Sequence, residues 1–219
     1  MTDLANWQYS KATCGLTVRA ARGTADLALI RKLRLEVFGA PSPQIAAVLE
    51  RRDLACDHVL VIENTTGRAV GTCRLTRVPP CDDLDVGDYF DLREVIERPG
   101  IKVELSYACV APDQRHGSVI RLMLAAVRDY CRHFSISTIF GCASLGTSDP
   151  NEALRVYNVL KQHSQRREHL APLLRFYHHL GAVVLAPPIL DPNFSCFDFF
   201  MALDFNSISE AIWRQILGL

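Results

Sequence analysis

Apolar residues recur along the chain with two different spacings, and each spacing predicts one kind of element. Residues 25–38 place apolar side chains three or four positions apart after a Gly-Thr start, which is typical of an amphipathic helix. Residues 58–63 and 68–78 are strand-like apolar runs, and the sequence NTTG lies between them. A short turn between two such runs predicts a β-hairpin with antiparallel strands.

The middle of the chain predicts a strand, a helix and a second strand in close succession. The first strand covers residues 102–111, a Pro-Asp turn follows it, the helix continues to about Phe134, and the second strand covers residues 137–145. Connections of this kind join neighbouring parallel strands through a crossover helix. Two helices near residues 150–166 and 170–180 and a closing antiparallel pair of strands, 181–186 and 197–205, complete the chain. We therefore expect one mixed α/β domain over residues 1–219.

Glu104 stands in an otherwise mostly apolar strand. Strict alternation places Glu104, Ser106, Ala108 and Val110 on one face of the sheet and their neighbours, Tyr107 among them, on the other. A carboxylate in apolar surroundings has a raised pKa, which suits a general base or acid near neutral pH. The alternative is a carboxylate at a strand end that pairs with an arginine or faces water.

The sequence QRHGSV connects this strand to the following helix. Backbone N–H groups at a helix start, next to a glycine that allows close approach, can hold a phosphate group. An ordinary strand-to-helix turn is the alternative interpretation. The residues of this candidate phosphate loop are Gln114, Arg115, His116, Gly117, Ser118 and Val119.

Three arginines follow on the helix at positions i, i+7 and i+11. Arg121, Arg128 and Arg132 therefore form a stripe opposite the apolar side of the helix. A solvated surface is the usual explanation of such a stripe. The sharper hypothesis is a docking surface for an acidic partner whose phosphate reaches the adjacent loop.

Composition narrows the function only slightly. The chain has 24 Lys and Arg and 24 Asp and Glu residues, so no net charge favours nucleic acid as a partner. The eight cysteines form no CxxC pair and no metal-ligand spacing, so we expect neither a metal site nor a disulfide framework, as in a cytoplasmic protein. The apolar runs are too short to span a bilayer, whereas a mean hydropathy of +0.09 is compatible with peripheral membrane contact.

The loop at residues 114–119 resembles the Q/R-x-x-G-x-G/A signature of the GCN5-related N-acetyltransferase (GNAT) superfamily, with Val119 at the second small position. That resemblance implies the GNAT fold, an α/β mixed sheet of about seven strands flanked by helices. Four segments also resemble, in the same order, the ornithine-lipid N-acyltransferases and long-chain N-acyl amino acid synthases, and more distantly the acyl-homoserine-lactone synthases. These segments are residues 56–75, 103–123, 139–150 and 173–184.

The resemblance implies transfer of a fatty acyl group from acyl carrier protein to the α-amine of an amino acid, without a separate cofactor. Glu104 falls at the family's catalytic carboxylate, while Cys109 and Val110 fall where backbone N–H groups polarise the thioester. The phosphopantetheine arm would lie where two parallel strands part, with its phosphate on the loop at residues 114–119. Tyr107 stands where ornithine acyltransferases commonly have arginine.

Further residues are expected to shape the substrate site. Arg34, Asp57 and Arg74 match charged positions of the related synthases, and we add Ser106 and Ser144 to this set. A rival mechanism uses Cys109 or Cys142 as an acyl-accepting nucleophile, although both lie in apolar strands without a neighbouring base. Rival functions are an acetyl-coenzyme A acetyltransferase, a signal synthase and a non-catalytic module that binds the carrier protein.

Overall fold

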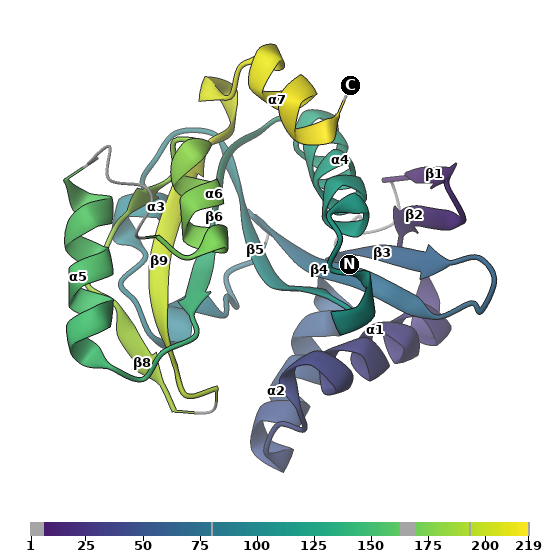
Figure 1. Ribbon diagram of the computed structural model, residues 1–219, viewed down its shortest axis with the longest axis horizontal. Coiled ribbons are helices and arrows are strands. Elements are labelled where there is room, and N and C mark those ends of the chain that lie inside the picture. The colour runs from purple at the N-terminus through teal and green to yellow at the C-terminus, as the bar shows by residue number, and fades with distance from the viewer. Residues whose placement is uncertain (1–6, 80, 163–169, 193, 219) are drawn as a thin grey trace.

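The computed structural model describes residues 7–79, 81–162, 170–192 and 194–218. In this part of the chain a nine-stranded sheet has the order β1-β2-β3-β4-β5-β6-β9-β7, with β8 paired to β9 (Figure 1). Only β5 and β6 pair in parallel. The strands are β1 (Ser10–Thr13), β2 (Leu16–Ala20), β3 (Asp57–Glu63), β4 (Ala69–Val78), β5 (Ile101–Val110), β6 (Ile136–Leu145), β7 (Val183–Val184), β8 (Ile189–Asp191) and β9 (Cys196–Asp204).

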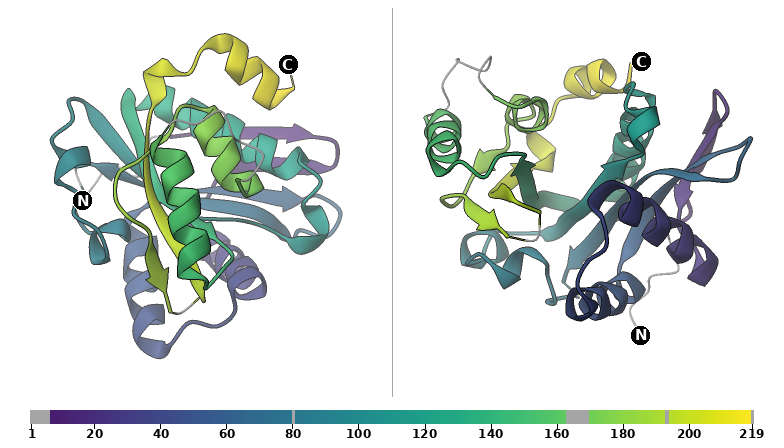
Figure 2. Two further views of the ribbon diagram at one scale, coloured as in Figure 1. Left: turned by 60° about the vertical axis from the view of Figure 1, so that its left-hand side comes forward. Right: turned by 60° about the horizontal axis from the view of Figure 1, so that its bottom comes forward.

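Helices cover both faces of the sheet (Figure 2). Helices α4, α6 and α7 lie on one face, whereas α1 and α2 lie on the other, where α1 packs on β4 and β5. The helices are α1 (Gly23–Phe38), α2 (Pro43–Ala55), α3 (Arg93–Ile96), α4 (Ser118–His133), α5 (Pro150–Lys161), α6 (Pro172–His179) and α7 (Glu210–Leu217).

The predicted elements agree with this architecture where their periodicity is strong. The β3–β4 hairpin, the β5–α4–β6 unit and the antiparallel pairing of β7 with β9 are all confirmed. The expected count of about seven strands was low because the short strands β1, β2 and β8 were not predicted. Helices α2 and α7 were also not predicted, and the part of the expected 150–166 helix beyond residue 162 lies outside the described residues.

Close packing of α4 on the sheet fixes the strand-to-helix loop. A Cβ atom at Gly71 of β4 would lie 2.5 Å from Cγ1 of Val119 and 2.9 Å from the sulfur of Met123. Only a glycine therefore allows the first turns of α4 to approach β4 this closely. The helix begins directly after Gly117, whose φ of 93° is left-handed.

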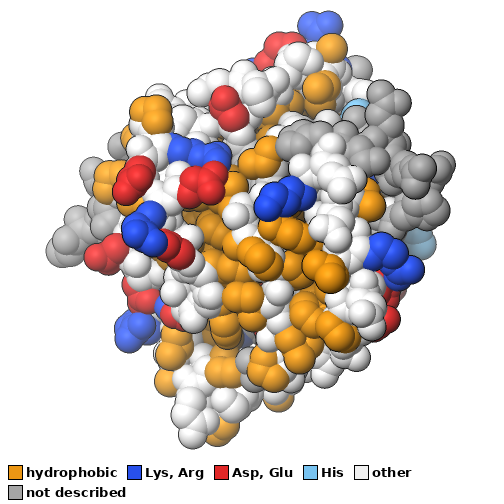
Figure 3. Space-filling view, turned by 90° about the vertical axis from the view of Figure 1, so that its left-hand side faces the viewer, with side chains coloured by type: hydrophobic (Ala, Val, Ile, Leu, Met, Phe, Trp, Pro, Cys, Tyr) orange, Lys and Arg blue, Asp and Glu red, His pale blue; other side chains and the backbone are white. Residues whose placement is uncertain are grey.

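One face of the molecule is markedly apolar (Figure 3). Leu154 of α5 and Ile189 and Leu190 of β8 are exposed on this side of the sheet. Among the described helices, none combines the length and apolar character that a membrane crossing requires. Peripheral membrane contact stays a prediction.

Candidate active site

The candidate site lies where the parallel strands β5 and β6 part. Their ladder runs from Ile101 and Ile136 to its last pair, Glu104 and Phe140, and beyond it the two strands diverge (Figure 1). At this point a Cβ on Gly141 would lie 2.3 Å from the carbonyl oxygen of Leu105. The glycine therefore lets the two backbones approach just before they separate.

Glu104 is almost completely buried at this divergence, with 1% of its surface exposed. Its carboxylate accepts hydrogen bonds from the backbone N–H groups of Val86, at 2.8 Å, and Asp85, at 3.2 Å. Burial and then the negative charge of Asp85 raise the pKa of Glu104 to about 7, although the two N–H donors and Arg74 oppose this shift. A carboxyl group with this pKa can take up or release a proton near neutral pH.

The segment that carries these N–H donors, residues 82–98, is anchored from two sides. Arg52 of α2 donates to Asp83 at 2.9 Å, to Asp85 at 2.9 Å and to Asp88 at 2.8 Å. On the opposite side the segment packs its apolar side chains into a second hydrophobic cluster with strands β6 and β9. The members contributed by the segment are Leu84, Val86, Phe90 and Val95. Two kinds of contact thus hold the N–H groups against Glu104.

A buried ion network adjoins Glu104. Asp53 of α2 accepts hydrogen bonds from Arg34 at 2.8 Å and from Arg74 at 3.1 Å. Arg74, which is fully buried, also pairs with the Asp85 carboxylate and donates to the hydroxyl of Ser106 at 3.2 Å. The sequence prediction that Arg34, Arg74 and Ser106 share one site is consistent with this placement, although Asp53 and Asp85 already pair with the two guanidinium groups.

His58 completes the network on its β3 side. Its Nε2 lies 3.0 Å from the backbone oxygen of Asp53, and its Nδ1 lies 3.4 Å from Nη2 of Arg34. An Nε2–H tautomer satisfies both contacts, because it donates to the carbonyl and accepts from the arginine. Burial and then the charge of Arg34 lower the pKa of His58 to about 4, so the ring is neutral at neutral pH.

A β-bulge in β5 overturns the expected position of Tyr107. The register of β4 against β5 shifts between Thr72 and Arg74, and Tyr107 has a φ of 49°. Its ring therefore leaves the face that strict alternation assigned to it and lies 4.8 Å from the Arg74 guanidinium and 5.0 Å from that of Arg34. The alternation prediction was wrong here because the extra residue reverses the side-chain direction.

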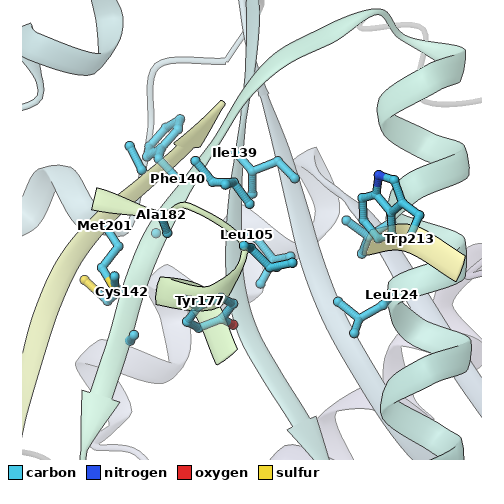
Figure 4. Close-up of a pocket in the computed structure, with 15 residues that line it drawn as sticks. Leu105, Leu124, Ile139, Phe140, Cys142, Tyr177, Ala182, Met201 and Trp213 are labelled. Atoms are coloured by element: carbon cyan, nitrogen blue, oxygen red, sulfur yellow. The ribbon is translucent and has the colours of Figure 1, made fainter. Parts of the chain in front are cut away.

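An apolar cavity opens at the same divergence, on the face of α4, α6 and α7 (Figure 4). Leu105 and the β6 residues 139–143 form its floor, Leu124 and Val127 of α4 form one wall, and Tyr177 and Trp213 come from α6 and α7. The strand divergence therefore places Glu104 beside a cavity suited to an apolar group.

The predicted phosphate loop lies at the positive end of α4. No side chain caps this helix start within the described residues, and its first turn contains no acidic residue. Arg115, His116 and Ser118 are exposed, whereas Val119 is buried, so only the backbone of Val119 could contribute to binding. Gln114 donates to Glu63 at 3.4 Å. An uncapped helix N-terminus of this kind favours an anion.

Comparisons with known proteins find acyltransferases. A family model described as an acetyltransferase (GNAT) domain matches residues 33–125. The chain is 26% identical to the L-ornithine N(alpha)-acyltransferase of Brucella abortus, with 89% of this chain and 86% of the relative aligned. The enzyme of the same name from Rhizobium meliloti is also 26% identical, at 89% and 81% coverage.

Among solved structures, FeeM, an N-acyl amino acid synthase from uncultured soil microbes, superposes with a TM-score of 0.61 and 10% identity, covering 88% of this chain and 93% of FeeM. The AHL synthase LasI gives a TM-score of 0.57 and 12% identity, covering 91% and 95%. The chain has the GNAT fold, and over most of its length it is similar to these N-acyltransferases.

One residue predicted for the substrate site lies elsewhere. Asp57 accepts a 2.6 Å hydrogen bond from the hydroxyl of Tyr130 on α4, so it belongs to the other face of the sheet. Asp53, four positions earlier and still in the last turns of α2, is the carboxylate that joins Arg34 and Arg74. Spacing alone could not decide between the two aspartates.

Ser144 takes a separate position near the end of β6. Its hydroxyl donates a 2.6 Å hydrogen bond to Asp198 of β9, two residues beyond Cys142. Alternation along β6 puts Ser144 on the same side as Phe140, the neighbour of Glu104 in the ladder. No hydrogen bond links it to the Arg74 network among the described residues.

The arginine stripe is not a free surface. Arg128 and Arg132 both pair with Glu210 of α7, and the side chain of Arg128 is only 13% exposed. The expectation that the stripe faces away from packed elements was wrong because α7 was not predicted. Arg121 is exposed on α4, near the end of α7.

The cysteine thiols have the properties of buried groups. Burial raises the pKa of Cys109 to about 11 and raises that of Cys142 further above its usual value. A thiol with a raised pKa is a poor nucleophile. Among the described residues, no three His, Cys, Asp or Glu side chains are grouped so that they could hold a metal ion.

Several residues of the site escaped sequence interpretation: Asp53, His58 and Asp85, together with the backbone of Val86. The sequence signal for Asp85 and Val86 was the Asp-rich stretch DDLDVGD, which was interpreted only as a loop. Loop residues far from Glu104 in sequence gave no indication that their backbone would reach it.

Proposed function

We propose that the chain transfers a long-chain fatty acyl group from the phosphopantetheine of acyl carrier protein to the α-amine of an amino acid. The observation that carries this proposal is the buried Glu104, with a pKa near 7, at the strand divergence beside an apolar cavity. Curated relatives named L-ornithine N(alpha)-acyltransferase support the reaction type, and ornithine is the first acceptor to test.

Proton transfer is the step assigned to Glu104. An α-ammonium group has no lone pair, so it must lose a proton before it can attack a thioester. Glu104 takes that proton directly or through a water molecule. The amine then forms the new C–N bond, the C–S bond breaks, and the departing thiolate takes up a proton.

The donor would lie on the face of α4, α6 and α7, which we term the donor side. The acyl chain would enter the apolar cavity, and the phosphate would lie at the uncapped start of α4, against residues 114–119. Backbone N–H groups at Cys109 and Val110, beyond the last ladder pair, would polarise the thioester carbonyl.

The acceptor would lie on the opposite face, formed by α1, α2 and residues 82–98, which we term the acceptor side. Besides the paired arginines of the buried network, the carboxylates Asp191 of β8 and Asp198 of β9 act on groups near this position. Burial and then the charge of Asp198 raise the pKa of Cys142, and burial and then the charge of Asp191 raise that of Tyr89. This field favours an acceptor with an additional positive charge, such as ornithine, over an acidic amino acid.

An acceptor screen tests the proposal. The protein would be incubated with long-chain acyl carrier protein or acyl-coenzyme A and single amino acids, and products would be detected by mass spectrometry. N-acyl amino acid formed from the carrier thioester is the expected result. Acetylation from acetyl-coenzyme A alone, an acyl-homoserine lactone, or carrier binding without product would each identify a rival function.

Glu104→Gln tests the proposed base. The amide oxygen can still accept the shorter hydrogen bond, from the N–H of Val86, but the amide cannot take up the proton, so kcat should fall on the order of 10²-fold or more. The wild-type kcat/KM should rise with pH through about 7, and this rise should disappear in the variant.

Asp57→Asn is the matched control, because Asp57 is a partly buried carboxylate whose pKa is also raised by burial, on the donor side of the sheet. Its kcat should stay within about threefold of wild type. Equal turnover by wild type and Glu104→Gln would remove Glu104 from the mechanism.

A further inference from the structure

Helix α7 lies along α4 and covers the arginine stripe of the donor side. Glu210, in its first turn, accepts hydrogen bonds from Arg128 and Arg132. One turn later the Trp213 ring lies 5.4 Å from the Arg128 guanidinium. At the other end of α7, a Cβ on Gly218 would lie 3.5 Å from Arg121. The short helix therefore contacts or approaches all three arginines of the stripe.

The same helix lines the apolar cavity. Trp213 lines the cavity opposite Tyr177 and beside Leu124, and only 3% of its surface is exposed (Figure 4). One side of α7 thus forms part of the cavity wall while its first turn engages the basic stripe. Movement of α7 would change both features together.

The cavity is too small for a long acyl chain as it stands. Its volume of about 60 Å³ holds only a few water-sized groups. The floor consists of β5 and β6 in the centre of the sheet, so the floor cannot move without breaking strand pairing. A long chain requires one of the helical walls to move.

Helix α7 is held by fewer buried side chains than the α4 wall. It has eight residues, and an isolated helix of that length is unstable in water. It packs on the core through Trp213 and the partly buried Ile212, Ile216 and Leu217, and its first turn is held by the ion pairs of Glu210, whose side chain is 59% exposed. Trp213 is the one fully buried residue of α7, against seven in α4, and ion pairs to an exposed carboxylate contribute little stability, so opening of α7 costs less than opening of α4.

We propose that α7 is a displaceable cover of the acyl cavity, released when an acidic helix of the carrier protein replaces Glu210 on Arg128 and Arg132. This inference rests on the proposed function and extends it. Glu210 supplies the same charge at the same arginines that an acidic helix would supply, so the two compete for one surface. Carrier docking and opening of the cavity then become one event.

Glu210→Gln tests the competition. Removal of the carboxylate should tighten binding of apo-carrier protein about three- to tenfold, because the carrier no longer displaces two ion pairs. Glu152→Gln is the matched control, since Glu152 is likewise the acidic residue in the first turn of a short helix, α5. Its carrier affinity should equal that of wild type.

Hydrogen exchange tests the movement. The backbone amides of α7 should exchange faster when wild-type protein is saturated with apo-carrier protein, while α4 becomes protected. Unchanged or slower exchange in α7 would contradict the proposal that α7 is a displaceable cover. A Glu210→Gln variant that binds the carrier no more tightly than wild type would contradict it as well.

A change of acyl donor distinguishes a failure of this inference from a failure of the proposed function. With acyl-pantetheine, which lacks an acidic helix, Glu210→Gln should still ease entry of the acyl chain into the cavity, but the rate should show no added salt dependence relative to wild type. If wild-type protein neither binds the carrier nor forms N-acyl product, the proposed function and the cover both fail. If product forms normally and the two readouts above are negative, only the cover fails.

Discussion

The two sides of the sheet around Glu104 are built by opposite means. On the acceptor side, Arg74 is completely buried and held by Asp53, Asp85 and Ser106. On the donor side, the cavity is lined by apolar side chains, and its α7 wall is fixed by ion pairs to the half-exposed Glu210. Charge is buried where we propose that the proton is transferred and exposed where we propose that the acyl chain enters.

The difference has a physical reason. A buried ion network has one low-energy arrangement, because any displacement leaves a charge without a partner in a poorly polarisable interior. Apolar walls lose little when they slide, and exposed ion pairs exchange readily with water. The acceptor side can therefore hold Glu104 and its N–H donors in place while the donor side adapts to a flexible chain.

Matched arginine substitutions on the two sides should test this difference in stability most clearly. Arg74→Met leaves Asp53 and Asp85 short of a partner inside the protein and should lower the free energy of unfolding by about 3–5 kcal/mol. Arg128→Met removes a pair to an exposed carboxylate and should cost less than about 1 kcal/mol. Denaturant unfolding measures both, and equal losses would show that the two sides do not differ in this way.

A fall in pH should lower the free energy of unfolding through His58 on the acceptor side. Its pKa is about 4 in the folded protein and about 6.5 when unfolded, so the unfolded chain binds the proton more readily as pH falls. Stability from this group is therefore present above pH 6.5 and lost between pH 6.5 and 4, by up to about 3 kcal/mol.

His58→Gln tests this assignment, because glutamine can keep a donor and an acceptor without titrating. Unfolding free energies measured from pH 7 to 4 should fall less steeply for the variant than for wild type. Parallel curves would mean that other groups, such as Asp53, cause the loss.

Gly141, where β6 approaches β5 between the two sides, should not tolerate an added side chain. Gly141→Ala places a methyl group against the Leu105 carbonyl, so β6 must shift from β5 at the site, at a cost of about 1–3 kcal/mol and with reduced turnover. Gly146→Ala is the control, because its added Cβ meets no atom within 4 Å. Similar thermal unfolding of the two variants would contradict the close approach.

The smallest effect is expected at the thiols. Cys142→Ala and Cys109→Ala should keep kcat within about threefold, because a thiol whose pKa is raised by burial is a poor nucleophile. Intact-protein mass spectrometry after incubation with the acyl thioester and no acceptor should show unmodified enzyme. A trapped acyl-cysteine would replace direct attack by a two-step mechanism.

The sequence by itself determined the elements whose evidence is local. Alternation and helical spacing are properties of neighbouring residues, so they predicted the β3–β4 hairpin and the β5–α4–β6 unit, with Glu104 on a strand before a helix start. The apolar side of α4 was likewise predicted, and its members Val119, Met123 and Val127 are buried.

Only the tertiary structure decided which distant groups meet. Asp53 rather than Asp57 joins the arginines, the bulge turns Tyr107 toward them, and α7 covers Arg128. The donors to Glu104 come from backbone 18 and 19 residues earlier, where side-chain identity carries no signal. These contacts depend on how separate elements pack, and packing is set by the whole chain, whereas periodicity records only which side of each element is apolar.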